Sequence, residues 1–353
     1  MNPPKPHRRE EPDAAAKPNP VIEAVSKATA KLRADADMLE LLEAHASLDP
    51  LAIDKLDFEA ARNNPTIADA VAVLLARQGR SSDAESLVPG VTSRDIAIEG
   101  ADGLLAARVY LPAGSAPFPV VVYFHGGGWV LADKDVYDGG ARGLCKAAGA
   151  IVISVDYRRA PEHRFPAAWD DAIAAYEWTL ANAATLGGDP ERIALAGESA
   201  GGNLALATAI AARDSQLVQP VHVLAVYPVT QTSLNTESYL ENAIAKPLNR
   251  AMMQWFFEHV VDDAEDLEDE RLQLIDADLE GLPSVTLITA RIDPLRGDGA
   301  KMETALEAAG VDVERRDYEG VTHEFFGAAA VLQKARDAQH FAGERLRQAF
   351  DGA

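Results

Sequence analysis

Hydrophobic positions follow a helical period in the first part of the chain and change character near residue 90. Between residues 21 and 80 the apolar residues recur at helical spacing. In the stretch IADAVAVLLARQ they place four side chains on one face: Ile67, Val71, Leu74 and Leu75. Two short alternating runs follow, RDIAIEG and LAARVYLP, separated by Ala-Asp-Gly. This pattern predicts an antiparallel hairpin after a set of N-terminal helices.

Beyond the hairpin, continuous apolar runs alternate with helical stretches. The runs are PVVVYF, AIVISVDY, RIALAGES, VHVLAVYP, SVTLITA and VDVERRDYEG. The helices between and after them are expected at about 138–149, 167–185, from Ser199 onward, 298–309 and 325–349. Such alternation is typical of a parallel sheet covered on both faces. Together with the hairpin it predicts an α/β fold with about eight strands in one mostly parallel sheet.

The chain divides into segments of different composition. Residues 1–20 are polar and rich in proline, which predicts a disordered tail. Residues 21–90 are helical, and 91–353 carry the sheet. Within the sheet region, 229–281 interrupts the alternation and contains NRAMMQWFFEHVV, whose aromatic content argues against disorder. We expect the N-terminal helices and this insertion to form a helical cap over the C-terminal edge of the sheet.

Charge and cysteine content exclude several kinds of partner. Lys plus Arg number 33 and Asp plus Glu number 55, for a net charge of −22. That charge argues against nucleic acid and against stable association with anionic membranes. The single cysteine, Cys145, allows neither an intrachain disulfide nor a cysteine zinc site and is interpreted as a buried small hydrophobe. No secretory signal or membrane-length apolar run is visible, so we expect a cytoplasmic protein without cofactor or metal.

The segment GESAGG, residues 197–202, is the first candidate for chemistry. It fits Gly-x-Ser-x-Gly between an apolar run and a helix-forming stretch, which is the context of a nucleophilic serine on a sharp turn. Gly197 and Gly201 are expected to be small because side chains there would collide with the neighbouring strand and helix. The alternative is a packed turn in which Ser199 only caps the following helix.

The segment HGGGW, residues 125–129, is the second candidate. Glycines allow backbone N–H groups to turn inward, and a developing oxyanion needs such fixed donors. A phosphate-binding loop is the alternative. The sequence lacks both the Gly-Lys-Ser/Thr of a P-loop and the glycine spacing of a dinucleotide site.

A serine hydroxyl needs a base, and the base needs an orienting acid. In a strand–serine–helix fold of this kind the chain order is serine, acid, histidine. Asp293 directly follows the run SVTLITA, with Asp298, Asp276 and Asp278 as rivals. Of the eight histidines, only His323 lies on a loop after the last strand. The predicted order is therefore Ser199, Asp293, His323.

These motifs carry a resemblance to a known family. The segments YFHGGGWV, DYRRAPEHRFPAAWDD, GESAGG, SYLENA, DPLRGDG and YEGVTHEFF resemble those of the bacterial hormone-sensitive lipase family of esterases, within the α/β-hydrolase fold. The resemblance covers about residues 90–345. It implies that 91–353 is a catalytic domain and that Ser199, His323 and Asp293 are nucleophile, base and orienting acid.

The resemblance also implies roles for backbone groups and for one histidine. The oxyanion donors of that family correspond to the N–H groups of Gly127, Gly128 and Ala200 in this chain. The resemblance further implies that His125 holds the glycine loop in shape. Four positions depart from the commonest family pattern: Glu198, Gly297, Glu324 and Arg159. Glutamate stands where glycine often follows the catalytic histidine. None of the departures removes a catalytic group, but they affect the expected shape of the pocket.

The resulting expectation is a serine esterase for short- to medium-chain carboxylic esters, acting through an acyl-serine intermediate. Trp129, Met253 and Phe256 are candidate pocket residues, although packing of the cap on the sheet would explain the Met252 to Phe257 cluster equally well. Two alternatives remain: a non-catalytic small-molecule-binding protein of the same fold, and an amide or peptide hydrolase using the same triad. A homodimer is expected from the resemblance alone.

Overall fold

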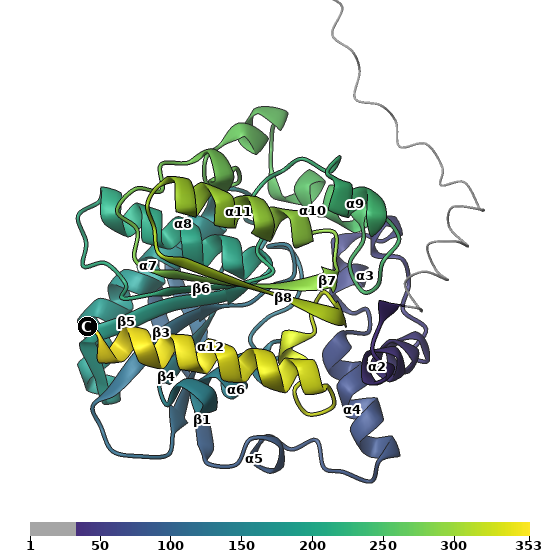
Figure 1. Ribbon diagram of the computed structural model, residues 1–353, viewed down its shortest axis with the longest axis horizontal. Coiled ribbons are helices and arrows are strands. Elements are labelled where there is room, and N and C mark those ends of the chain that lie inside the picture. The colour runs from purple at the N-terminus through teal and green to yellow at the C-terminus, as the bar shows by residue number, and fades with distance from the viewer. Residues whose placement is uncertain (1–32) are drawn as a thin grey trace, which may run out of the picture.

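A computed structural model describes residues 33–353 and contains one eight-stranded sheet (Figure 1). The spatial order of the strands is β1-β2-β4-β3-β5-β6-β7-β8. Pairs β1/β2 and β2/β4 are antiparallel, and the remaining pairs are parallel. The predicted α/β fold with a mostly parallel sheet is therefore confirmed. The strands are β1 (Val91–Gly100), β2 (Gly103–Pro112), β3 (Phe118–Phe124), β4 (Ile151–Asp156), β5 (Gly188–Glu198), β6 (Val223–Val226), β7 (Val285–Ile292) and β8 (Val313–Thr322).

Helices cover both faces of the sheet (Figure 1). α6 (Asp138–Ala148) and α12 (Gln333–Asp351) pack on one face, and α7 (Ala167–Asn182), α8 (Ala200–Asp214) and α11 (Arg296–Ala308) on the other. Strand β3 shows why its sequence is a continuous apolar run. Successive residues point to opposite faces, so Val122 enters the core beneath α7 and α8 while Tyr123 enters the core beneath α6 and α12.

Two further groups of helices lie outside this core, one before β1 and one inserted after β6. The N-terminal group comprises α2 (Ala36–Ala46), η1 (Ile53–Lys55), α3 (Phe58–Arg62), α4 (Ile67–Arg77) and α5 (Ala84–Leu87). The insertion after β6 comprises α9 (Glu237–Glu241), α10 (Arg250–Val260), η3 (Ala264–Glu268) and η4 (Leu274–Asp276). Of these helices, α2, α3 and α10 lie beside the carboxyl ends of the strands (Figure 1). The two groups touch, since the indole Nε1 of Trp255 donates to the carbonyl of Leu56 at 3.1 Å. α4 begins with a capping box between Thr66 and Asp69.

The C-terminal helix differs from its prediction. It begins at Gln333 rather than near residue 325, and only a short 3₁₀ turn, η5 (Phe326–Ala328), precedes it. Leu332, directly before the helix, is extended with φ −105° and ψ 131°, so a continuous helix from residue 325 is not possible. Phe325 and Phe326 are completely buried in the core instead of lying on a helix surface.

The described range limits which of the sequence-based expectations can be compared with the structure. The predicted tail, 1–20, and the first part of the 21–90 segment lie outside the described range. Within residues 33–353, no helix is both long and apolar enough to cross a bilayer. In the same range, no group of three or more His, Cys, Asp or Glu side chains could hold a metal ion.

Candidate active site

Ser199 occupies the turn between β5 and α8. Glu198 ends the strand, Ala200 begins the helix, and Ser199 has φ 58° and ψ −118°. A positive φ in a non-glycine residue is strained, and such strain persists only where the surroundings hold it. Here the Ser199 N–H donates to the Val226 carbonyl at 2.8 Å, which ties the turn to β6. The hydroxyl therefore has a fixed position at the carboxyl edge of the sheet.

The glycines around the serine allow close backbone contact, as predicted. A Cβ on Gly197 would collide with the carbonyl of Gly201, and one on Gly201 would collide with the carbonyl of Phe124. Both obstacles are backbone atoms, which move only if the strand or helix moves. The tight turn thus depends on the absence of side chains at these two positions.

Gly201→Ala should consequently destabilise the protein far more than Gly202→Ala. A Cβ on Gly202 would lie 3.0 Å from Pro228 Cβ, 3.2 Å from its Cα and 3.3 Å from the Gly197 carbonyl oxygen, so shifts of a few tenths of an ångström would suffice, against a contact of 2.0 Å at Gly201. We expect a loss of about 3 kcal/mol in the free energy of unfolding for Gly201→Ala and about 1 kcal/mol or less for Gly202→Ala. Chemical denaturation of both variants measures the difference, and equal losses would contradict this explanation of the turn.

His323 and Asp293 meet Ser199 at this edge. His323 Nε2 lies 3.0 Å from Ser199 Oγ, and His323 Nδ1 lies 2.7 Å from Asp293 Oδ2. All three side chains are buried: Ser199 is 5% exposed, His323 3% and Asp293 0%. Asp293 follows β7, and His323 follows β8. Residues from three separate strand ends therefore form one hydrogen-bonded row.

The rival acids lie elsewhere. Asp298 is completely buried, but its carboxylate accepts from the Gln231 amide at 2.9 Å. Burial raises its pKa to about 8. Asp276 and Asp278 are exposed. Within the described part of the chain, the only histidine hydrogen-bonded to Ser199 is His323.

The loop carrying Asp293 is held by the insertion. The Ser238 hydroxyl donates to the Pro294 carbonyl at 2.7 Å, and the Asn242 amide donates to the Asp293 carbonyl at 3.1 Å. The Gly297 N–H donates to Ser238 Oγ at 3.1 Å, and a Cβ on Gly297 would lie 2.6 Å from that oxygen. Glycine in place of the family's usual acidic residue thus leaves room for the Ser238 hydroxyl. We call the contacts of Ser238 and Asn242 with this loop the clamp on the acid loop.

The glycine loop lies opposite the serine. Gly127 and Gly128 have φ values of 97° and 60° and line the same cavity as Ser199. A Cβ on Gly127 would collide with the Leu131 carbonyl, and one on Gly128 with the ring of Phe256. Ala200 is the first residue of α8, so its N–H has no partner within the helix. Positions 127 and 128 therefore leave no room for a side chain, and the Ala200 N–H is a helix donor without an intrahelical partner.

Comparisons with known proteins identify the family of this chain. The sequence model of the alpha/beta hydrolase fold matches residues 121–327. This chain belongs to the α/β-hydrolase family. Carboxylesterase NlhH of Mycobacterium tuberculosis is 42% identical over 280 residues, covering 77% of this chain and 88% of that protein. Ethyl acetate hydrolase of Pseudomonas putida is 33% identical over 261 residues, covering 72% and 82%. The solved structure of an esterase from Pyrobaculum calidifontis superposes with a TM-score of 0.75 at 34% identity, covering 83% of this chain and 94% of that one.

His125 supports the glycine loop of this α/β-hydrolase from inside. It is completely buried, and its Nδ1 donates to the Gly126 carbonyl at 2.7 Å. Its ring stacks on Tyr157 at 4.3 Å between centroids, and the Tyr157 hydroxyl donates to the His125 carbonyl at 2.9 Å. Burial lowers the pKa of His125. A neutral, stacked imidazole fits a supporting role better than a chemical one.

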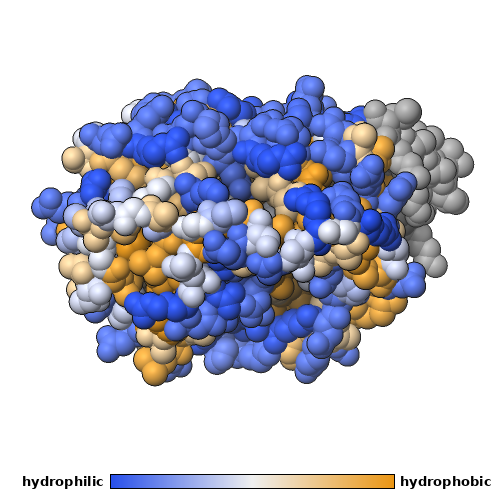
Figure 2. All heavy atoms as spheres, turned by 90° about the horizontal axis from the view of Figure 1, so that it is seen from below, coloured by the Kyte–Doolittle hydropathy of each residue, from blue (hydrophilic) through white to orange (hydrophobic). Residues whose placement is uncertain are grey.

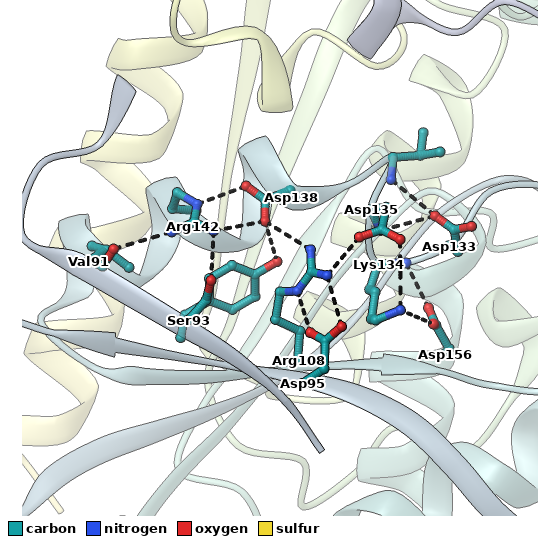
Figure 3. Close-up of polar contacts among 12 residues, drawn as sticks. Val91, Ser93, Asp95, Arg108, Asp133, Lys134, Asp135, Asp138, Arg142 and Asp156 are labelled. Atoms are coloured by element: carbon teal, nitrogen blue, oxygen red, sulfur yellow. Dashed lines mark hydrogen bonds and ion pairs between the residues drawn. The ribbon is translucent and has the colours of Figure 1, made fainter. Parts of the chain in front are cut away.

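The segment after the glycine loop is fixed by a network of charges (Figure 3). Arg108 on β2 binds Asp95 on β1 at 2.6 Å and also contacts Asp135 at 2.7 Å and Asp138 at 3.4 Å. Lys134 pairs with Asp156, at the end of β4, at 3.0 Å. The network joins the hairpin, the start of α6 and the end of β4, so the chain leaving the glycine loop is held on two sides.

Glu198 extends the site behind the serine. Its carboxylate is completely buried and accepts hydrogen bonds from the hydroxyls of Tyr123 and Tyr227. A Cβ on Gly140 of α6 would collide with this carboxylate, so glycine there leaves space for it. Burial raises the pKa of Glu198 to about 7, with the two tyrosine hydrogen bonds opposing the rise. The Tyr227 ring packs 4.4 Å from the His323 ring, which links the network to the imidazole.

Acidic neighbours set the charge state of His323. Burial lowers the pKa of the imidazole, whereas the charge and hydrogen bond of Asp293 raise it, as do Glu324 and Glu198. The net direction is upward from the usual histidine value. The imidazole therefore gains a proton more readily than a free histidine does.

The cavity in front of Ser199 is small. Its volume is about 120 Å³, and its walls come from the N-terminal helices, the glycine loop and α10. Phe256 and Met252 line it. Of the other expected pocket residues, Met253 and Trp129 are each 1% exposed and belong to the core. Trp129 stacks on Trp169 at 5.1 Å instead of facing the cavity.

Sequence reasoning missed two tyrosines of the site. Tyr227 has a φ of 37° directly after β6 and lies between Glu198 and His323. Tyr137, just before α6, donates to Glu324 Oε1 at 3.3 Å. Neither belongs to a motif with a chemical signature. The position of Tyr227 at a strand end, directly before Pro228, was the only signal that could have pointed to it.

Proposed function

We propose that this protein hydrolyses carboxylic esters by forming an acyl intermediate on Ser199. One observation carries the proposal: in a chain of the α/β-hydrolase family, Ser199 Oγ, His323 and Asp293 form a continuous row with distances of 3.0 and 2.7 Å. The relatives named carboxylesterase and ethyl acetate hydrolase support the reaction class. The motifs favour an esterase of the hormone-sensitive lipase type.

The proposed reaction begins with proton transfer. Asp293 accepts a hydrogen bond from the Nδ1–H of His323, which keeps the proton on Nδ1 and leaves Nε2 free to accept the hydroxyl proton of Ser199. The Ser199 oxygen then bonds to the carbonyl carbon, and the carbonyl electrons move to its oxygen. His323 gives the proton to the departing alcohol as the ester bond breaks. Water repeats both steps, so the acid leaves and Ser199 regains its proton.

The backbone N–H groups of Gly127, Gly128 and Ala200 are our candidates for binding the oxyanion. The left-handed φ values of the two glycines and the start of α8 at Ala200 support this assignment. Such donors contribute about 3 to 4 kcal/mol each to the transition state in other serine hydrolases.

The substrate proposed for the cavity is an ester with short alkyl groups. A volume of about 120 Å³ is well below the few hundred Å³ of pockets that hold drug-sized ligands. We assign the N-terminal helices and the 229–281 insertion to a cap, because both contribute walls to this cavity. Rates with p-nitrophenyl esters of increasing chain length test the size limit. The medium-length chains of the expected range are too long for this cavity alone, and the second cleft described below is relevant to them.

The acid limb of the pH profile should report the base. The protonated imidazole does not accept a proton, so kcat/KM should fall as the pH drops through the pKa of His323. Because that pKa is raised, the midpoint should lie above about 6.5, the ordinary histidine value. Glu198→Gln removes one acidic neighbour and should move the midpoint down, whereas Glu307→Gln, on the exposed side of α11, should leave it unchanged. An upward shift in Glu198→Gln would contradict this account.

A non-catalytic binding protein and an amide hydrolase are the alternatives. Mass spectrometry after treatment with a fluorophosphonate should show one adduct on Ser199, which a binding protein would lack. Matched ester and anilide substrates then separate the two enzymes, with the ester expected to react faster. No adduct and no ester turnover would defeat the proposal.

Two finer proposals remain, of which the second depends on the family resemblance. They are a cytoplasmic location and a homodimer. Cell fractionation tests the first, and light scattering of the purified full chain tests the second.

A further inference from the structure

A second cleft lies next to the active-site cavity. Its volume is about 630 Å³, and it runs between α4 and α5 on one side and α6 and α12 on the other. Val71, Leu75 and Val88 make the α4–α5 side apolar, whereas the α6–α12 side also carries polar residues such as Asp138, Lys146 and Gln339. Figure 2, which views the molecule from below, shows hydrophobic residues in recesses of a mostly polar face. A cleft of this size and lining suits an alkyl chain.

The cleft and the active-site cavity share a wall. Ile67, Val136 and Glu324 line both spaces. Ile67 begins α4, Val136 lies before α6, and Glu324 directly follows His323. On one side of this wall is the small cavity with Ser199, and on the other is a space about five times larger by the two volumes. The wall is one residue thick where Glu324 stands.

Glu324 is the residue of this wall that fits its position least. It is half-buried at a φ of 63°, where an L side chain is strained and glycine is not. Its side chain is held by one hydrogen bond, from the Tyr137 hydroxyl to Oε1 at 3.3 Å. Family members often have glycine here. A strained glutamate therefore fills a space that a glycine would leave open between the two cavities.

We propose that the second cleft is shaped to extend the substrate site for a longer alkyl chain. In this protein the Glu324 side chain stands between the cleft and Ser199 and keeps such a chain out. Glu324 is then a specificity-determining residue: its side chain and its contact with Tyr137 set the chain length that the enzyme accepts. This inference rests on the proposed ester hydrolysis. It assigns Glu324 no part in the bond-breaking steps.

Glu324→Gly tests the inference, with Glu324→Gln as the matched control. The measured quantity is the ratio of kcat/KM for p-nitrophenyl octanoate to that for p-nitrophenyl acetate, which cancels general effects on His323. Each buried methylene contributes roughly a fourfold gain in binding, so entry of two methylenes should raise the ratio by more than about tenfold in Glu324→Gly. Glu324→Gln keeps the volume and should retain the wild-type ratio. A parallel series with ethyl and octyl acetates varies the alcohol side.

A second substitution locates the chain in the cleft. Val71→Trp places a large side chain in the cleft. Combined with Glu324→Gly, it should cancel the gain in the octanoate-to-acetate ratio of kcat/KM. Made alone, it should leave that ratio as low as in the wild type. A gain in either ester series, cancelled by Val71→Trp, supports the proposal and shows which side of the ester enters. Unchanged ratios in both series, or a gain that survives Val71→Trp, would overturn it.

The test remains decisive if Glu324→Gly turns over poorly. Calorimetry then compares methyl octanoate binding by Ser199→Ala with binding by Ser199→Ala/Glu324→Gly, and the second protein should bind about tenfold more tightly. Equal binding would overturn the proposal. Failure of the wild type to hydrolyse p-nitrophenyl acetate would instead defeat the proposed function, so the two failures are distinguishable.

Discussion

Replacing Ser199 by alanine is expected to lower kcat for p-nitrophenyl acetate by about 10⁶-fold, the size of loss seen when a serine nucleophile is removed from a triad. The substitution deletes one oxygen from a buried site and leaves the hydrogen bond of the Ser199 N–H to Val226 in place. The backbone strain at a φ of 58° is similar for serine and for alanine at this position, so the substitution leaves it unchanged. Folding should therefore be unaffected, and the loss should be confined to turnover.

Three measurements on Ser199→Ala make this outcome decisive. Steady-state rates give kcat, circular dichroism on heating shows whether the fold persists, and mass spectrometry shows whether the fluorophosphonate adduct is lost. A folded variant that retains its rate would refute the nucleophile assignment. Retained labelling would place the reactive group on another side chain.

Asp293→Asn should reduce kcat by about 10⁴-fold, because an amide in place of the carboxylate favours the wrong tautomer of the histidine. Asp293 Oδ2 faces His323 Nδ1 at 2.7 Å, and Oδ1 accepts the Leu295 N–H at 2.9 Å. With an amide group at this position, Nδ1 no longer has a carboxylate to hold its proton. Nε2 then carries the proton and is unable to accept one from Ser199.

Asp298→Asn is the matched control for this experiment. Asp298 is equally buried, five residues further along the chain, and its pKa is raised to about 8. It is therefore mostly protonated at neutral pH, and an asparagine resembles that neutral form. We expect less than about a tenfold change in kcat, since no contact with His323 is lost. Equal losses in the two variants would contradict the assignment of Asp293 as the acid.

The sheet could be predicted because buried strands have a local signature in the sequence, and the Ser199–His323–Asp293 row because chain order narrowed the candidates. Strands buried on both faces must be apolar at every position, and β3 shows this with Val122 and Tyr123 in opposite cores. The turn at Ser199 requires glycine at positions 197 and 201, and this spacing around a serine is visible in the sequence. Asp293 and His323 follow from the chain order that the fold imposes.

The pocket was harder to predict because it depends on which side of a helix faces inward. Met252 and Phe256 lie at i and i+4 on α10 and both line the cavity, whereas Met253 lies about 100° round the helix and packs in the core. Trp129 follows three glycines with a φ of 59°, which turns its ring beneath α7. Periodicity identifies an apolar helix face but not the neighbour that it meets.

Tyr227 was beyond sequence reasoning, and Glu324 was noted there only as a departure from the family pattern that affects the pocket. Their importance comes from contacts between segments far apart in the chain, such as Tyr137 with Glu324 and Tyr227 with His323. Both residues adopt positive φ values, which no side-chain preference announces. Their roles became visible only when distant loops were brought to one place.

The clamp on the acid loop has a consequence for engineering this enzyme. The 229–281 insertion borders the substrate cavity and, through Ser238 and Asn242, also fixes the backbone at Asp293 and Pro294. A chimera that borrows the insertion of a relative would change the acid's alignment together with the pocket. Successful exchange would require co-transplanting residues 293–297, with glycine or a larger residue at 297 chosen to match the incoming partner of that loop.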